Sequence, residues 1–309
     1  MAVVAAAAAT GISALFSVTL LRRWWDRGRT NQALLIWGVA LAMFCVASAG
    51  LLSGVVGGWT SPEFRTFYLF GGVLNVSWLA LGSIAVNARS VAVSRWTGAI
   101  LVGVGIVVAR QVTVAEEPAL WLPSAVLAGA WGITLLVGHQ RAVIALSTTV
   151  LAIYSIIATV LVVVADYVTP LPAGGLPEGA VLFEPMVRGF AVGGNSVGAV
   201  TVVVSALVSS AALVWRRPDR SADRMVLEDT RRGGYVNAIA RWIFKGRTGQ
   251  GEVVAHLVRG NLLIALGVAV AAAGGVLSFL GETVGHAISF TVGVAIMYAG
   301  FVRTTRPVQ

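Results

Sequence analysis

Long apolar runs, separated by short polar stretches, cover almost the whole chain. Nine of these runs have the roughly 20 residues that a helix needs to cross a bilayer. They lie near 2–21, 33–56, 66–86, 95–114, 119–138, 143–166, 190–214, 260–280 and 284–302. Apolar residues are continuous within each run, whereas strands of a membrane barrel alternate between apolar and polar residues. The pattern predicts an all-α bundle of about nine transmembrane helices.

Composition agrees with this class of fold. Of the 309 residues, 57% are hydrophobic and 11% are charged, whereas soluble domains carry about 25% charged residues. A soluble enzyme and a disordered chain are therefore excluded. The single cysteine, Cys45, lies within an apolar run, so an intrachain disulfide is excluded as well. We expect a multi-pass protein of the inner cell membrane, with the lipid bilayer as its main partner.

The positions of the charged residues predict the orientation of the chain. With the N-terminus outside, nineteen of the 22 basic residues fall on the cytoplasmic side, and three, Arg65, Arg110 and Arg188, fall on the outer side. Cytoplasmic loops of membrane proteins carry an excess of Arg and Lys, so we expect the N-terminus outside and the C-terminus in the cytoplasm. The formal net charge of +9 then reflects topology, and nucleic acid is not an expected partner.

The predicted spans divide the chain into three parts. Residues 1–215 form a seven-helix transmembrane bundle, 216–259 a basic cytoplasmic linker, and 260–309 a C-terminal two-helix hairpin. Five apolar residues of the linker share one helical face: Tyr235, Val236, Ile239, Trp242 and Ile243. This pattern favours an amphipathic helix at the membrane surface, with its basic residues facing anionic lipids. A solvated linker is the alternative.

Two further features concern packing. The outer loop near 167–189 is rich in Pro and Gly, and it contains Glu184 and Arg188, which are spaced to pair on one helical turn. Small residues that allow close helix contact recur at four-residue spacing. They are Gly50, Gly54 and Gly58; Ser124, Ala128 and Gly132; and Gly194 and Gly198. The stripes predict a tight bundle.

Two asparagines within the spans are the first candidates for a solute site. By the helical rise, Asn75 lies about 15 Å along the chain from Arg65, and Asn195 about 10 Å from Arg188. Each follows a pair of glycines and lies one or two positions before a serine, as in Gly193-Gly194-Asn195-Ser196. If spans one to three and five to seven are parallel repeats, the asparagines correspond, near an interface where transporters bind substrate. Alternatively, each makes an interhelical hydrogen bond.

In topology, residues 1–215 resemble the SWEET and PQ-loop sugar facilitators, which implies passage of a small solute. Arg110 is the third candidate residue, because it lies about 22 Å along its span from Arg95 and ionisable groups within membranes are often functional. It would otherwise extend to the outer surface or pair with Asp166, Glu116 or Glu117. A small-solute transporter with Asn75, Asn195 and Arg110 as its substrate-binding residues is our leading hypothesis.

Two other functions remain open. The small-residue faces and the basic linker would also suit a non-catalytic assembly or sensor protein with a membrane-protein partner. More remotely, Ser196 on the seventh span and His286 on the ninth resemble the serine and histidine of rhomboid intramembrane proteases, which implies a hydrolase. The histidines and the cysteine lack metal-binding spacing, so we expect no metal and no cofactor, and catalysis is the less favoured hypothesis.

Overall fold

The structure is a computed structural model that describes residues 2–88, 90–138, 140–172, 177–215, 250–279 and 283–305. This part of the chain is helical apart from short connections, and it contains no strand. The elements are α1 (Ala2–Asp26), α2 (Gln32–Gly57), α3 (Ser61–Phe67), the π-helix η1 (Tyr68–Leu74), α4 (Asn75–Asn87), α5 (Val91–Val114), α6 (Pro118–Val137), α7 (Gln140–Val164), α8 (Gly179–Leu182), α9 (Pro185–Trp215), α11 (Gln250–Phe279) and α12 (Thr283–Thr305).

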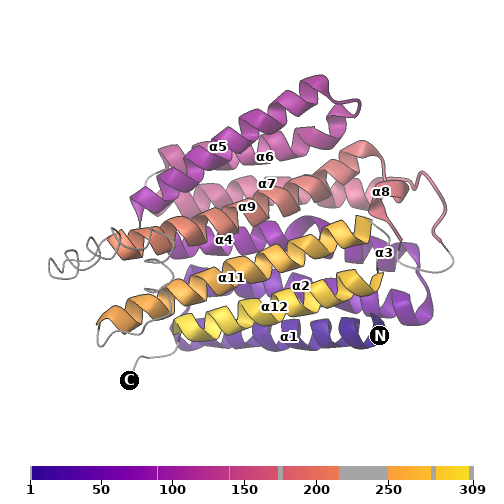
Figure 1. The fold of residues 1–309 in the computed structure, drawn as a ribbon. Helices are drawn as coiled ribbons and strands as arrows, with labels where there is room; N and C mark the ends of the chain where they lie inside the picture. The colour runs from indigo at the N-terminus through magenta and orange to yellow at the C-terminus, as the bar shows by residue number, and fades with distance from the viewer. Residues whose placement is uncertain are drawn as a thin grey trace, which may run out of the picture.

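The long helices lie side by side and alternate in direction along the chain (Figure 1). Within the described residues, eight helices are long and apolar enough to cross a membrane. The ninth predicted span corresponds to α12, whose apolar stretch Ala287–Arg303 is shorter. The predicted all-α bundle of about nine spans is therefore confirmed, and the chain is a multi-pass membrane protein. We call the end that holds α8 and the beginnings of α1, α3 and α9 the α8 end; the charge pattern predicts that it faces outside.

Helix α9 lies at the centre of the bundle. It contacts η1, α4, α5, α6 and α11. Helices α11 and α12 form a hairpin that packs against the bundle, α11 on α9 and α12 on α1. Helix α1 packs mainly against α2, whereas α6 packs more closely against α5 and α9 than against α7. The two helix triplets that parallel repeats would relate are thus packed differently.

Three helix boundaries differ from the sequence prediction. The span predicted at 66–86 begins at Ser61 and contains η1. Helix α9 begins at Pro185, within the stretch predicted as a loop, and α11 begins at Gln250, within the predicted linker. Apolar runs mark the membrane core, whereas the ends of helices extend into the polar interface. The amphipathic helix predicted around 235–243 lies outside the described residues.

The small-residue stripes are covered largely by helices of this same chain. A Cβ atom at Gly132 would lie 2.9 Å from the Gly98 carbonyl oxygen of α5, and one at Gly198 would lie 2.8 Å from the Ser77 backbone nitrogen of α4. At Gly54 the added atom would meet the ring of Trp59 at 2.5 Å. These close approaches supply packing where lipid gives no hydrophobic drive, so the stripes serve folding within the chain.

Candidate functional site

The segment Gly193-Gly194-Asn195-Ser196 lies where α9 crosses η1. A Cβ at Gly194 would collide with the Val73 carbonyl oxygen of η1, and one at Gly193 would lie 2.8 Å from the Tyr154 hydroxyl of α7. Glycine is therefore required at both positions for α9 to fit between η1 and α7. This close crossing brings the next residue, Asn195, within reach of the η1 backbone.

The two asparagines bond the backbone of the third span close to the point where the π-helix η1 changes to the α-helix α4. In a continuous α-helix, the carbonyl of Gly72 would accept from the N–H of Val76. Here Asn195 Nδ2 donates to the Gly72 carbonyl at 2.7 Å, and the Val76 N–H donates to Asn75 Oδ1 at 2.6 Å. The two side chains therefore bond the two backbone groups that a continuous α-helix would join, close to the point where η1 ends and α4 begins. The structure thus brings the two asparagines to the same stretch of the third span, where each side chain bonds a backbone group.

A cavity of about 550 Å³ lies between this crossing and the C-terminal hairpin. One wall consists of α3, η1 and α9, and the opposite wall consists of α11 and α12 through Ala271, Ala272 and Phe290. Five aromatic rings line it: Phe44, Phe64, Phe67, Tyr68 and Phe290. The other polar or charged side chains among its lining residues are those of Glu178, Arg188, Asn195 and Ser196. The cavity is thus mostly apolar, with a few polar groups on one wall.

The cavity begins at the α8 end and extends deep into the bundle. Pro177, Glu178 and Arg188 line its beginning, and Ala199 lines it further along α9. Ala199 is fourteen residues from Pro185, the first residue of α9, which corresponds to about 21 Å of helix. Helix α9 has 31 residues, so Ala199 lies near its midpoint and the cavity reaches about the middle of the bundle.

The same helices enclose a second, much smaller void further from the α8 end. Its volume is about 20 Å³, and its lining residues include Leu41, Leu79 and Val268. Each of them lies about one helical turn from a residue that lines the large cavity, on the side away from the α8 end. The pairs are Leu41 with Phe44, Leu79 with Val76, and Val268 with Ala271. The interface between bundle and hairpin is therefore wide at the α8 end and closed by apolar side chains beyond it.

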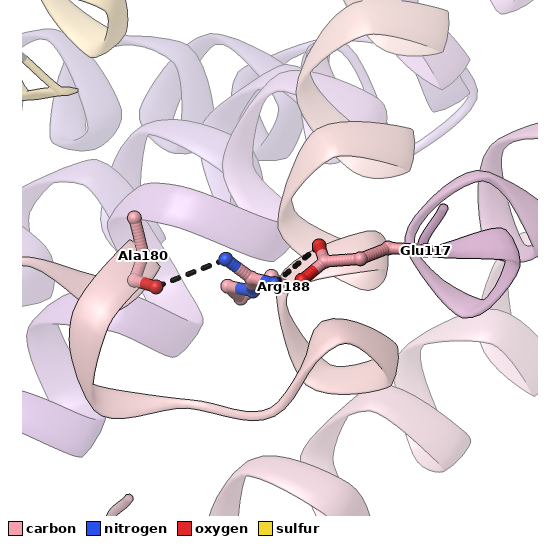
Figure 2. A network of polar contacts seen from close by, with 3 residues as sticks. All are labelled: Glu117, Ala180 and Arg188. Atoms are coloured by element: carbon pink, nitrogen blue, oxygen red, sulfur yellow. Dashed lines mark hydrogen bonds and ion pairs between the residues drawn. The ribbon is translucent and has the colours of Figure 1, made fainter. Parts of the chain in front are cut away.

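An ion pair holds the wide end of the cavity in place (Figure 2). Arg188 on α9 donates to Glu117 Oε2, before α6, at 2.6 Å and to the Ala180 carbonyl of α8 at 3.0 Å. The two charged side chains are 20% and 48% exposed, respectively. The predicted pairing of Arg188 with Glu184 is wrong for this structure. Spacing along one helix identifies only local partners, whereas Glu117 lies in the connection before α6.

Of the three predicted site residues, Asn195 lines the cavity, whereas Asn75 and Arg110 are not among its lining residues. Asn75 is 0% exposed, and its Nδ2 has no hydrogen-bond partner among the described residues. Arg110 lies exposed on α5 and has no ion-pair partner in the described part of the chain. Sequence reasoning missed Glu178 and the aromatic rings as site residues, because it searched the polar groups within the spans.

The remote hydrolase hypothesis gains no geometric support. The Ser196 hydroxyl donates to the Val192 carbonyl of its own helix, and the side chain of His286 lies outside what the structure describes. Among the described residues, no group of three or more His, Cys, Asp or Glu side chains is arranged to hold a metal ion.

The fold and the cavity define a multi-pass helical membrane protein with a deep, mostly apolar cavity beside its central helix. Comparison with protein-family models, curated proteins and solved structures finds no match for the chain.

Proposed function

We propose that the protein binds a small amphipathic solute in the cavity and carries it across the membrane along the interface between bundle and hairpin. The observation that carries this proposal is the cavity of about 550 Å³ beside Asn195, a size typical of small-molecule sites. Its apolar walls suit the body of such a solute. Asn195 and Ser196 supply polar groups about 15 Å along α9 from Pro185, roughly a third of the length of this helix.

The narrow part of the interface supports passage rather than binding alone. The large cavity is wide at the α8 end, and the same helices continue past Leu79 and Val268 to a void of about 20 Å³. A carrier exposes its site to one side of the membrane at a time, with the other side closed. The wide and closed parts of this interface match one such state.

The packing favours solute binding over assembly through small-residue faces. Gly132, Gly194 and Gly198 all lie against other helices of this chain, so they leave little close-packing surface for a partner. Asn195 bonds the Gly72 carbonyl and also lines the cavity. A solute site at the crossing of η1 and α9 explains this position better than a surface for assembly does. The transition between π- and α-helix at that crossing is a type of local distortion frequent at functional sites.

Filling the cavity should weaken solute binding strongly. Ala272 on α11 lines the cavity, whereas its neighbour Ala273 is exposed on the outside of the same helix. We expect Ala272→Phe to weaken saturable binding of the neutral fluorescent amphipath N-phenyl-1-naphthylamine by roughly tenfold or more, since the new ring occupies the apolar space. Binding is measured by fluorescence titration of the full chain in phosphatidylcholine nanodiscs.

Ala273→Phe is the matched control, because it adds the same ring to the same helix outside the cavity. It should bind the probe as the unchanged protein does, and partition of the probe into lipid is common to all three samples. Equal saturable binding by both variants, or no saturable binding by the unchanged protein, contradicts the proposed function.

A further inference from the structure

We propose that the preferred ligand of the cavity is a bulky organic cation, with its positive charge near Glu178 and its apolar groups against the aromatic rings. This inference rests on the proposed function and names the chemical class of its solute. Three observations carry it: the rings that line the cavity, the neutralisation of Arg188 within the chain, and the excess of acidic residues at the α8 end.

The aromatic walls are the first observation. Five aromatic residues from α2, α3, η1 and α12 line the cavity. Phe67, Tyr68 and Phe290 are 9%, 9% and 7% exposed, whereas Phe44 and Phe64 are at most 1% exposed, so the first three offer the ring surface that a cation can contact. The face of an aromatic ring carries partial negative charge and attracts a cation, most strongly where water is excluded. Arg65 is also on α3, but its guanidinium lies over the rings of Tyr167 and Phe183. These two rings are not among the lining residues, so Arg65 does not occupy the rings of the cavity.

The charges at the wide end of the cavity are the second observation. Glu178 and Arg188 both line it. The guanidinium of Arg188 is paired with Glu117 at 2.6 Å, so its positive charge is balanced by a residue outside the cavity wall. Glu178 has no ion-pair partner among the described residues. The net charge of these three groups is negative, which favours a cation over an anion.

The wider surroundings act in the same direction. At the α8 end, the described residues include six acidic side chains: Glu63, Glu116, Glu117, Asp166, Glu178 and Glu184. Three arginines, Arg65, Arg110 and Arg188, balance half of them. A cleft with an excess of one sign of charge concentrates ligands of the opposite sign. A cation is therefore drawn to the wide end before it meets the rings.

Two probes of the same shape and opposite charge test the inference. Tetraphenylphosphonium is a cation and tetraphenylborate an anion, each with four phenyl groups around a central atom. We expect the cation to displace N-phenyl-1-naphthylamine from the full chain in phosphatidylcholine nanodiscs at a concentration at least tenfold lower than the anion. Glu178→Gln should weaken displacement by the cation roughly fivefold at low salt, and added salt should reduce the difference.

Two controls separate charge from structure. Glu184→Gln removes an acidic residue of the same end that does not line the cavity, and it should weaken the cation's affinity much less than Glu178→Gln does, because it contributes only to the longer-range field. Phe67→Leu keeps an apolar wall but removes a ring, and it should weaken the cation more than the neutral reporter. Equal displacement by both ions, or no effect of Glu178→Gln, overturns the ligand class. In that outcome, the difference between Ala272→Phe and Ala273→Phe would still support the cavity as a solute site.

Discussion

Replacing Gly194 with alanine should destabilise the protein by about 3 kcal/mol, a large effect for the addition of one methyl group. The added Cβ would collide with the Val73 carbonyl oxygen, and a backbone carbonyl within a helix cannot move aside as a flexible side chain can. Helices α9 and η1 would have to separate, which would also stretch the hydrogen bond from Asn195 to Gly72. Thermal unfolding of the purified protein in detergent measures the change.

Gly103→Ala is the matched control for this substitution. Gly103 lies within α5, is exposed, and has no atom within 4 Å of the place where a Cβ would be built. Because alanine favours the helix by about 1 kcal/mol over glycine, this variant should be as stable as the unchanged protein or more stable. Similar losses of stability in the two variants would show that α9 and η1 do not cross as closely as described.

Glu117→Gln should be the second most damaging substitution, with a loss of about 2–3 kcal/mol. Removal of one partner leaves the guanidinium of Arg188 largely buried without its counter-charge. The loss is smaller than for a fully buried pair because Glu117 is 48% exposed. Arg188 also holds the Ala180 carbonyl, so the position of α8 depends on the same side chain. Two measurements report the change: the rate of proteolysis at α8 and its flanking residues, and thermal unfolding of the purified protein in detergent.

The neighbouring residue provides the comparison. Glu116 is exposed and has no ion-pair partner among the described residues, so Glu116→Gln should change stability by less than about 0.5 kcal/mol. The double variant Glu117→Gln with Arg188→Met should recover part of the loss, because no buried charge then lacks a partner. If Glu116→Gln and Glu117→Gln behave alike, the ion pair in Figure 2 does not hold α9 to α6.

The class of the fold was predictable from sequence because the signal is local. A run of about 20 apolar residues has one stable conformation in a bilayer, and each span can be recognised without knowing its neighbours. The π-helix was not predictable, because Tyr68–Leu74 has the same apolar character as the α-helices around it. What sustains it is the contact with α9, which comes from residues more than a hundred positions away.

The candidate site shows the same limit. Paired glycines precede Asn75 and Asn195, and the structure explains the pattern around Asn195 by a close helix crossing. The partner of Arg188 was mispredicted because Glu117 is 71 residues away in sequence, whereas Glu184 has ideal local spacing. The cavity itself depends on how the hairpin packs on α9, and no local pattern encodes that arrangement.

We propose that solutes reach the cavity from the α8 end, and cysteine labelling tests this route most directly. All variants carry Cys45→Ser, which removes the native thiol. Ala199→Cys then places a single thiol deep in the cavity. Two controls place it elsewhere: Ala128→Cys in a fully buried position, and Ala273→Cys on the outside of the bundle. A charged, membrane-impermeant methanethiosulfonate reagent, added outside intact cells, should modify the cysteine at 199 and leave the other two unmodified, because thiols react as solvated thiolates. If the cysteine at 199 is as unreactive as the one at 128, from outside and in inverted membranes alike, the cavity is not accessible and the account is wrong.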